Sequence, residues 1–430
     1  MLGAVFAVFA ILIILSIPIG FVMGISSIVP VLLNPAFPAK AAFVARQMVG
    51  GVDSTPIIAI PLFVLSGIIM AKGGVSDKLF NIFAYFVGDK LGGMPCAVVL
   101  TCLFYGAISG SAPATTAAIG SMAIPLMVKL GYDEVFTSAI VAVSGGLGVI
   151  IPPSIPFILF GLSSGVSVGA LFISGIIPGF LIGFCLMVYA VIYCKKHGQD
   201  QAKLDEYCRQ LRNNGFFNVF KNSFWALLTP VVILGGIYGG IVTPTEAACI
   251  SVFYSIIVCC FIYKTMDFKG VVATFSEAAR NYAPLLFILA AALAFGRVLT
   301  MMQAPQIIAQ AIMSIVSTKI GVLIVINIFL VLVGMVMDTG PAILILTPIL
   351  FPLVTSVGVN PVHFGVIMIV NLAIGFVTPP MGINLFVASS LTSIPVVTIA
   401  KKALPLIFAF SIALVLITFI PWISTCLVNL

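Results

Sequence analysis

Residues 106–131 read GAISGSAPATTAAIGSMAIPLMVKLG, and residues 334–358 read GMVMDTGPAILILTPILFPLVTSVG. Both stretches are apolar, and glycine and proline interrupt both of them close to the start. Each is followed by an apolar segment with two consecutive prolines, GLGVIIPPSIPFILFGLSSG at 146–165 and IGFVTPPMGINLFVASSLTS at 374–393. The chain therefore contains the same pair of interrupted segments twice.

The glycines and prolines of the two copies match in spacing. Gly131 precedes Pro152 by 21 residues, and Gly358 precedes Pro379 by the same number. Further matches are Gly106 with Gly334, Pro113 with Pro341, Pro125 with Pro352, and Gly148 with Gly375. We interpret this pattern as an internal duplication. The predicted organisation is a first repeat at 1–194, a connecting loop at 195–222 and a second repeat at 223–430.

Composition places these repeats in a membrane. Of the 430 residues, 62% are hydrophobic and 7% are charged, whereas about 25% are charged in ordinary soluble domains. A soluble protein of this size must cover itself with polar groups, but a bilayer can accept the apolar surface. Each spanning helix needs about 20 apolar residues, so we expect an all-α polytopic membrane protein with roughly 11 to 14 embedded segments. We interpret 1–21 as a retained first span, because no basic residue precedes its apolar run.

Glycine and proline have a specific meaning inside a bilayer. Proline removes a backbone donor, and glycine lets the chain leave the helix. Freed backbone groups are costly in lipid unless a partner satisfies them, so such breaks mark cavities or binding sites. Paired breaks in two repeats are typical of secondary transporters. We predict two re-entrant helical hairpins, at about 94–130 and about 333–355, and inverted repeats if each half holds an odd number of spans.

The segment between the repeats indicates the orientation of the chain. From Lys195 to Lys221 it carries six lysines and arginines against three acidic residues. Lysines and an arginine mark another loop at 264–280, whereas the intervening turn at 239–246 has no basic residue. Short basic loops stay on the cytoplasmic side. We therefore predict that 195–222 is cytoplasmic, and we attribute the net charge of +7 to such span ends and not to nucleic-acid binding.

Asp338 is the first candidate functional residue. It is the only acidic residue after Glu277, and it lies at the predicted tip of the second hairpin. An ionisable side chain within a membrane segment indicates a functional site. The alternative is that its carboxylate caps the helix that follows the tip. The two roles are compatible.

Hydroxyl side chains gather at the breaks. They are Ser109, Ser111, Thr115 and Thr116 at the first break, Ser163 and Ser164 after the first double proline, and Thr378, Ser389 and Ser390 around the second. Hard cations prefer oxygen ligands, and carbonyl groups freed by a broken helix also supply them. The alternative for each hydroxyl is a hydrogen bond back to its own helix. For the cluster as a whole we favour contact with an ion or a solute.

Other chemistry has little support in the sequence. Arg297 can neutralise an acidic solute, or it can extend to the membrane interface. The nine cysteines match no metal-site spacing, and the histidines are only two. GLSSG at 161–165 lacks the strand–turn–helix context and the partnered histidine of a hydrolase. Because no phosphate-binding loop is present, we expect no enzyme activity and no cofactor, and we expect energy from an ion gradient or a partner.

The motifs GAISGSAPATTAAIGSMAIP, GVIIPPSIPFILFG, MDTGPAILILTPILFPL and GFVTPPMGINLFVAS resemble the large membrane subunit of tripartite ATP-independent periplasmic (TRAP) transporters. The resemblance covers nearly the whole chain. It implies an elevator-type transporter whose scaffold and transport domains interleave across both halves. It also implies two partners in the bacterial inner membrane system, a soluble periplasmic substrate-binding protein and a small four-helix membrane subunit, here expected as a separate chain.

The resemblance also implies where ions and solute bind. One sodium site falls at the first hairpin and first double proline, on Ser109, Gly148, Ile151 and Pro152. The second falls at the second hairpin and second double proline, on Gly334, Thr339, Gly375, Thr378 and Met381. Ser154 replaces at the first break what is Met381 at the second, so the two sites need not be chemically equal. The solute is expected between the hairpin tips, near Thr115, Thr116, Ser163 and Asp338, where two cations would offset the carboxylate charge.

The expected function is sodium-coupled uptake of an organic acid, such as a C4-dicarboxylate, a sugar acid or a sialic acid. One alternative is a sodium/dicarboxylate-type symporter that works without a binding protein. Another is a non-transporting membrane subunit, which leaves the duplicated breaks unexplained. The sequence does not name the solute, because pockets lined by glycine and serine bind many carboxylates.

Overall fold

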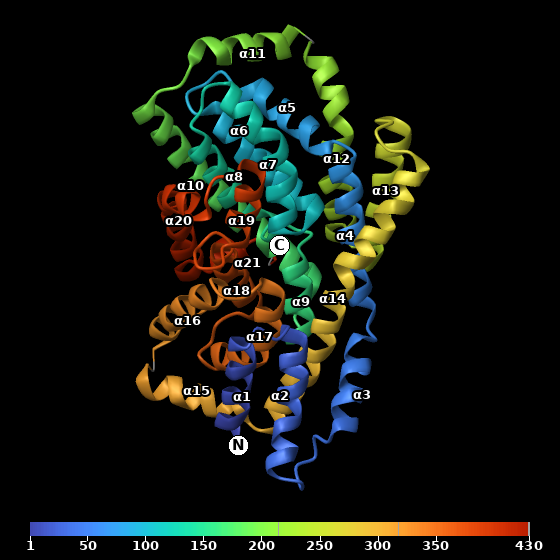
Figure 1. Cartoon of the computed structure of the whole chain (residues 1–430), viewed down its shortest axis with the longest axis vertical. Coiled ribbons are helices and arrows are strands. Elements are labelled where there is room, and N and C mark those ends of the chain that lie inside the picture. The colour runs from blue at the N-terminus through green and yellow to red at the C-terminus, as the bar shows by residue number, and fades with distance from the viewer. Residues whose placement is uncertain (214, 317, 429–430) are drawn as a thin grey trace.

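The computed structural model describes residues 1–213, 215–316 and 318–428, and within these residues the regular structure is entirely helical (Figure 1). The helices of the first repeat are α1 (Leu2–Ile14), α2 (Ile19–Leu33), α3 (Ala41–Val52), α4 (Thr55–Lys72), α5 (Val75–Val87), α6 (Gly93–Ser109), α7 (Ala112–Lys129), α8 (Glu134–Gly145), η1 (Gly146–Val149), α9 (Ile155–Ser164) and α10 (Val168–His197). The later helices are α11 (Gln201–Asn213), α12 (Phe216–Tyr238), α13 (Pro244–Ile256), η2 (Ile257–Ile262), α14 (Phe268–Met301), α15 (Ala304–Ile315), α16 (Lys319–Gly334), α17 (Thr339–Ser356), α18 (Pro361–Gly375), α19 (Ile383–Thr392), α20 (Val396–Phe419) and α21 (Trp422–Thr425).

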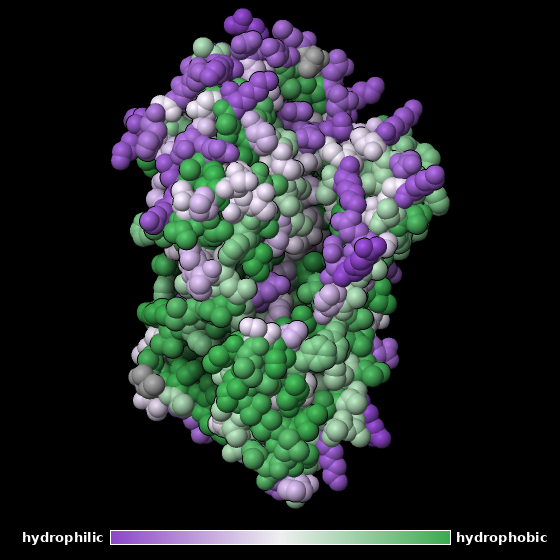
Figure 2. Space-filling model, viewed as in Figure 1, coloured by the Kyte–Doolittle hydropathy of each residue, from purple (hydrophilic) through white to green (hydrophobic). Residues whose placement is uncertain are grey.

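Long apolar helices dominate the molecule. Among the described residues, seven helices are long and apolar enough to cross a membrane, namely α4, α10, α12, α13 with η2, α14, α17 and α20. The surface is apolar over most of its length, and hydrophilic residues gather at the end that α11 covers (Figure 2). The chain is therefore a multi-pass membrane protein, as its composition predicts.

The duplicated segments form corresponding helix pairs. Gly110 and Ser111 join α6 to α7, which pack against each other, and residues 335–338 join α16 to α17. The helix that follows each pair begins with a polar cap. The side chain of Asp133 accepts two backbone N–H groups at the start of α8, and that of Asn360 does the same at the start of α18. Because a capping side chain satisfies N–H groups that the helix leaves unpaired, the two copies start this helix in the same way.

The two helix pairs differ from the predicted ranges at one point. The first pair, α6 and α7, coincides with the predicted range of about 94–130. The second begins earlier than 333, because its first arm is α16, which starts at Lys319. The sequence between Gly321 and Gly334 contains neither glycine nor proline, so no helix break within it indicates that α16 is one arm of a helix pair. Re-entry of these pairs into the bilayer remains a prediction.

The helices form two groups, and each group draws on both repeats. In the first helix group, α4 packs on α13, and α14 packs on α2, α3 and α4. In the second helix group, α9 packs on α17, α19 packs on α7 and α8, and α20 packs on α8 and α10. The groups meet where α4 and α14 contact α6, α9 and α17. The repeats are therefore interleaved in space.

The connection between the repeats is largely helical, in contrast to the predicted loop at 195–222. Helix α11 occupies its middle, and α10 and α12 extend into its ends. Leu204 and Cys208, one turn apart on α11, are buried, and this helix packs on α5. The guanidinium of Arg212 also pairs with Asp89 at 2.8 Å. These contacts explain why a polar segment forms a helix across one end of the molecule (Figure 1).

Candidate functional site

Two glycines bring the first helix pair into backbone contact with the segment before the first double proline. A β-carbon built on Gly106 of α6 would lie 2.9 Å from the α-carbon of Gly148 in η1. A β-carbon on Gly148 would lie 2.4 Å from Oγ1 of Thr115 and 2.7 Å from the carbonyl oxygen of Ser111. Because any side chain at either position would overlap its neighbours, glycine is needed for α6, α7 and η1 to meet.

A cluster of neutral oxygen atoms lies at this contact. Oγ of Ser109 and Oγ1 of Thr115 are 2.7 Å apart, and Oγ1 of Thr115 donates to the carbonyl oxygen of Ser111 over 2.9 Å. Both hydroxyl side chains are buried. Ser109 and Gly148, predicted as sodium ligands, therefore lie together, and Thr115, predicted to contact solute, belongs to the same cluster. Such an oxygen cluster suits a hard cation.

Ile151 and Pro152 follow η1 directly. The amide of Ile151 donates to the carbonyl oxygen of Leu147 over 3.0 Å. The side chain of Ile151 is buried, and its Cδ1 would lie 2.2 Å from a β-carbon built on Gly179 of α10. The side chains of both residues are hydrocarbon, so only their carbonyl oxygens are available as cation ligands.

The second repeat contains the same glycine contact. A β-carbon built on Gly334 of α16 would lie 3.2 Å from the α-carbon of Gly375, the last residue of α18. The amide of Met381 donates to the carbonyl oxygen of Met335 over 3.1 Å. Three of the predicted sodium residues, Gly334, Gly375 and Met381, thus lie where α16 meets the second double proline. The hydroxyl of Thr378 donates to the carbonyl oxygen of Ile374 in the preceding helix α18 over 2.7 Å, which corresponds to the alternative that the sequence left open.

We call the Gly106–Gly148 contact the first junction and the Gly334–Gly375 contact the second junction. A carboxylate distinguishes the second junction from the first. The hydroxyl of Thr339 donates to Oδ1 of Asp338 over 3.3 Å, and Thr339 is 5% exposed. At the first junction the corresponding polar groups are the neutral hydroxyls of Ser109 and Thr115. A cation at the second junction would therefore lie near a carboxylate, whereas a cation at the first would meet neutral hydroxyl groups.

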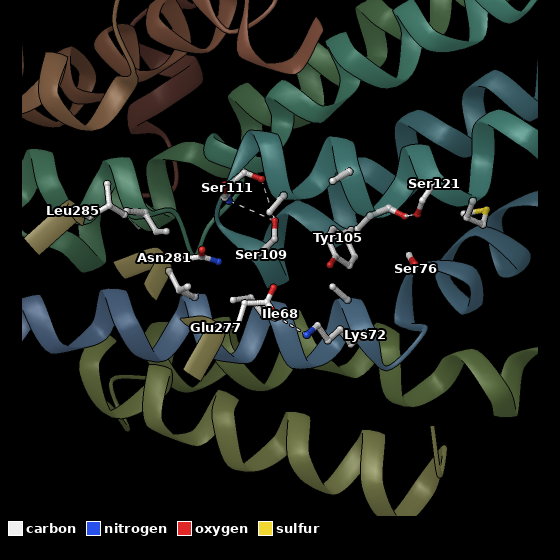
Figure 3. A pocket seen from close by; sticks show the side chains of 18 of the residues that line it. Ile68, Lys72, Ser76, Tyr105, Ser109, Ser111, Ser121, Glu277, Asn281 and Leu285 are labelled. Carbon is white, nitrogen blue, oxygen red and sulfur yellow. Dashed lines mark hydrogen bonds and ion pairs between the residues drawn. The ribbon is translucent and has the colours of Figure 1, made fainter. Parts of the chain in front are cut away.

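A cavity of about 1160 Å³ lies between the two helix groups. Helices α4 and α14 of the first helix group form one wall, and α6, α7, α9 and the start of α17 contribute to the other. Figure 3 shows Lys72 and Glu277 on one wall and Tyr105, Ser109 and Ser111 on the facing wall. The volume is sufficient for a small organic molecule.

Asp338 lies where this cavity meets two others. It also lines a cavity of about 100 Å³ with Ser111 and Thr339, and an apolar cavity of about 580 Å³ with Val336 and Met337. Asp338 is the N-cap residue of α17, but its side chain makes no capping hydrogen bond. The residue is exposed and lines these cavities, and its carboxylate lies close to the backbone N–H groups of Thr339 and Gly340, so both the functional role and the capping role stay predictions.

Lys72 and Glu277 form an ion pair on the cavity wall, between the end of α4 and α14. Their side chains are 46% and 43% exposed, so a solute in the cavity can reach both. Asn281, one turn after Glu277, lines the same cavity. From the sequence alone, Lys72 is interpreted as a span-end charge and Glu277 is not selected. Glu277 could have been selected because it is an acidic residue inside a 34-residue helix that is largely apolar. Its pairing with Lys72 could not be predicted, because the two residues are 205 positions apart in the chain.

Four of the five predicted solute residues do not line this cavity, and one of them is Thr115, which is buried in the oxygen cluster behind Ser109 and Ser111. Thr116 is buried, and its hydroxyl donates to a carbonyl oxygen of its own helix over 3.0 Å. Ser163 lies near the end of α9, whereas the cavity touches Ile155 at the start of that helix. Arg297 is exposed on α14, and the cavity residues of α14 end at Ile288. Of the predicted solute residues, Asp338 is the one that lines the large cavity.

Residues 6–423 match the family model described as "Tripartite ATP-independent periplasmic transporter, DctM component". This chain belongs to the DctM family of TRAP transporters. The resemblance inferred from the paired motifs is thereby confirmed. Membership in this family of large permeases supports the TRAP interpretation and not the stand-alone symporter.

Curated members of the DctM family cover almost the whole chain. The isethionate TRAP transporter permease protein DctMQ of Oleidesulfovibrio alaskensis is 43% identical over 98% of the chain, which spans 65% of that longer protein. The C4-dicarboxylate large permease protein DctM of Pseudomonas aeruginosa is 39% identical, over 95% of the chain and 93% of that protein. The sialic acid large permease protein SiaM of Vibrio cholerae is 35% identical, over 90% of each.

Two solved structures share the fold of this DctM-family chain. The YdaH transporter of Alcanivorax borkumensis aligns with a TM-score of 0.58 at 15% identity, over 90% of the chain and 89% of that protein. MtrF of Neisseria gonorrhoeae aligns with a TM-score of 0.59 at 14% identity, over 90% and 85%. At this identity the likeness concerns the fold alone.

Proposed function

We propose that this chain is the solute-translocating subunit of a TRAP transporter that carries an organic acid inward together with sodium, by an elevator movement. The relatives are named for isethionate, C4-dicarboxylates and sialic acid, which are all organic acids. The proposal places the chain in the bacterial inner membrane. Its proposed partners are a small four-helix membrane subunit and a periplasmic substrate-binding protein.

The position of the two glycine junctions carries this proposal. The Gly106–Gly148 contact joins α6 to η1, and the Gly334–Gly375 contact joins α16 to α18. These helices pack on α7, α8, α17 and α20 of the second helix group, and the large cavity lies between that group and the helices α4 and α14. A solute held at the tips of the two helix pairs would move with the second helix group. Sodium at the junctions would lie beside the solute and offset the repulsion between Asp338 and an anion.

The energy available from this coupling is sufficient for accumulation. A tenfold sodium gradient supplies about 1.4 kcal/mol per ion, and one net positive charge moving inward adds about 2.3 kcal/mol per 100 mV. Two sodium ions with a monoanion would supply roughly 5 kcal/mol. This energy corresponds to an accumulation of about a thousandfold or more.

Reconstitution tests the proposal. The chain is placed in vesicles with its small membrane subunit, and uptake of isethionate, succinate and sialic acid is measured with the cognate binding protein outside. We expect uptake of one of these acids that needs an inward sodium gradient and increases with an inside-negative voltage. Uptake that depends on neither the sodium gradient nor the voltage would exclude the coupling of solute uptake to sodium entry. Uptake at full rate without the binding protein would favour the stand-alone symporter.

A further inference from the structure

A second polar pocket lies at the end of the molecule that α11 covers. It has a volume of about 660 Å³ and lies between α5, α11 and α12. Its polar lining residues are Lys78, Asn81, Asn213, Asn218, Asn222 and Ser223. None of these residues lines the large central cavity, so this pocket is separate from the proposed transport site.

The pocket combines one ammonium group with several amide side chains. Nζ of Lys78 lies 4.4 Å from the centroid of the Tyr263 ring, and Oγ of Ser223 donates to the carbonyl oxygen of Lys78 over 2.7 Å. These contacts fix the position of the lysine at the pocket. Asp77, its neighbour in the chain, lines the central cavity and interacts electrostatically with Lys78. Among the described residues that line the pocket, none is acidic.

This set of donors suits an oxygen-rich anion. An ammonium group supplies three hydrogen-bond donors, and each asparagine amide supplies two. Hydrogen bonds from a charged donor to phosphate oxygens are among the stronger ones in proteins. The lining residues therefore favour a phosphate group over a neutral or cationic ligand.

The pocket lies at the boundary between the polar end and the apolar surface of the protein. Helix α12, whose Val219 lines the pocket, is a candidate span from Phe216 to Tyr238. Its first turns expose Phe217, Phe220 and Phe224. Exposed phenylalanine side chains at the start of a span suit the acyl region next to the lipid headgroups. Figure 1 places the start of α12 at the α11 end of the molecule, where hydrophilic residues gather in Figure 2.

We propose that this pocket binds the phosphate headgroup of an anionic phospholipid, whose acyl chains lie against the exposed phenylalanines of α12. The basic residues between Lys195 and Lys221 indicate that this end faces the cytoplasm, and anionic headgroups attract basic residues at that surface. The bound lipid would connect α5 and α12 to α11, the helix that joins the two repeats.

Lipid binding to the purified transporter tests this proposal. The chain is purified with its small membrane subunit, delipidated, and titrated with phosphatidylglycerol or phosphatidylcholine, and bound lipids are counted by native mass spectrometry. The variants are Lys78→Gln, which removes the ammonium, and Asn222→Asp, which places a carboxylate on an exposed position of the pocket. The matched controls Lys196→Gln and Gln210→Glu make the same charge changes at exposed positions of the same end, outside the pocket.

We expect the wild-type transporter and both controls to retain phosphatidylglycerol in preference to phosphatidylcholine. Each pocket variant should lower the apparent affinity for phosphatidylglycerol about fivefold or more, because one lysine near a lipid surface contributes about that factor. Equal affinity for the two lipids, or pocket variants that match their controls, would overturn the proposal. Full displacement of the lipid by millimolar inorganic phosphate would assign the pocket to a free anion instead.

Discussion

Gly148 of η1 lies directly against Gly106 of α6, so that a β-carbon on Gly106 would lie 2.9 Å from the α-carbon of Gly148. The corresponding glycines of the second repeat, Gly334 and Gly375, make the same contact at 3.2 Å. Residues matched by their spacing in the sequence are thus contact partners within each repeat. Because helices approach this closely only where side chains are absent, the contact holds each helix pair against its double-proline break.

The first prediction concerns this contact. Gly148→Ala would place a methyl group 2.4 Å from Oγ1 of Thr115, and overpacking of this kind costs about 1–3 kcal/mol. If the same displacement weakens a cation site, the apparent sodium affinity should fall about tenfold or more. Uptake measured against sodium concentration, together with thermal unfolding, would test this.

Gly24→Ala on α2 is the matched control, because a β-carbon at Gly24 would meet nothing within 4 Å. It should leave the sodium dependence unchanged and should not lower the unfolding temperature, because alanine favours a helix more than glycine does. A Gly148→Ala variant with wild-type sodium affinity would show that the first junction does not hold the coupling ion.

The second prediction concerns Asp338. Asp338→Asn should reduce solute uptake about tenfold or more, while the free energy of unfolding changes by less than about 0.5 kcal/mol, because asparagine caps a helix about as well as aspartate does. Uptake assays and thermal unfolding of the same preparations measure the two effects.

Asp267→Ala provides the opposite case, because alanine cannot cap a helix, whereas asparagine caps about as well as aspartate. Asp267 caps α14 by accepting from the amide of Gly270 over 2.8 Å, so its loss should cost about 1 kcal/mol of stability without changing solute specificity. If Asp338→Asn spared uptake while Asp338→Ala lowered stability, the side chain would be a structural cap.

The third prediction concerns the charge balance of the cavity. Glu277→Gln leaves the ammonium of Lys72 unpaired in the cavity, and Lys72→Gln leaves the carboxylate of Glu277 unpaired. For an anionic solute the first change should lower KM and the second should raise it, each about three- to tenfold at low ionic strength. Both side chains are nearly half exposed, so stability should change by less than about 1 kcal/mol.

Initial uptake rates over a range of solute concentrations would measure these shifts. The double variant Lys72→Gln with Glu277→Gln should return KM close to the wild-type value, because the net charge of the cavity is restored. Parallel changes of KM in the two single variants would show that the pair acts as a structural link between α4 and α14.

The fourth prediction concerns pH and helix α11. The hydrogen bond from Arg212 lowers the pKa of Asp89 below its ordinary value of 3.8. A carboxyl group whose pKa is lowered by folding stabilises the folded state above its unfolded pKa, and this contribution is lost as the pH falls through the folded pKa. The contacts of α11 should therefore weaken as the pH falls below about 4. Because the two side chains are 28% and 41% exposed, the effect should stay below about 1 kcal/mol.

Hydrogen exchange of the α11 amides, corrected for intrinsic rates and followed from pH 6 to pH 3, would measure this change. Asp89→Asn should remove the dependence, since no carboxylate is left to titrate at that position. Exchange that responds to pH equally in both proteins would assign the effect to other groups.

Much of the fold and part of the site could be predicted from the sequence. The excess of apolar residues is sufficient to place the chain in a membrane, and matched spacings such as Gly131 to Pro152 and Gly358 to Pro379 reveal the duplication. Two copies with the same spacing of glycine and proline break their helices at the same positions, so the matched residues occupy equivalent places in the structure. Asp338 could be selected because an acidic side chain is costly inside an apolar membrane segment and occurs there mainly where it serves a function.

The tertiary structure alone decided which polar groups face the cavity. The predicted solute residues Thr115, Thr116, Ser163 and Arg297 do not line it. Lys72 and Glu277, 205 residues apart in the chain, pair on its wall. A helix that is apolar on every side carries no periodic pattern that marks its inner face. The sequence by itself therefore determined the class of protein, its repeats and the places where its helices break. Which turn of each helix lines the cavity depended on packing between segments far apart in the chain.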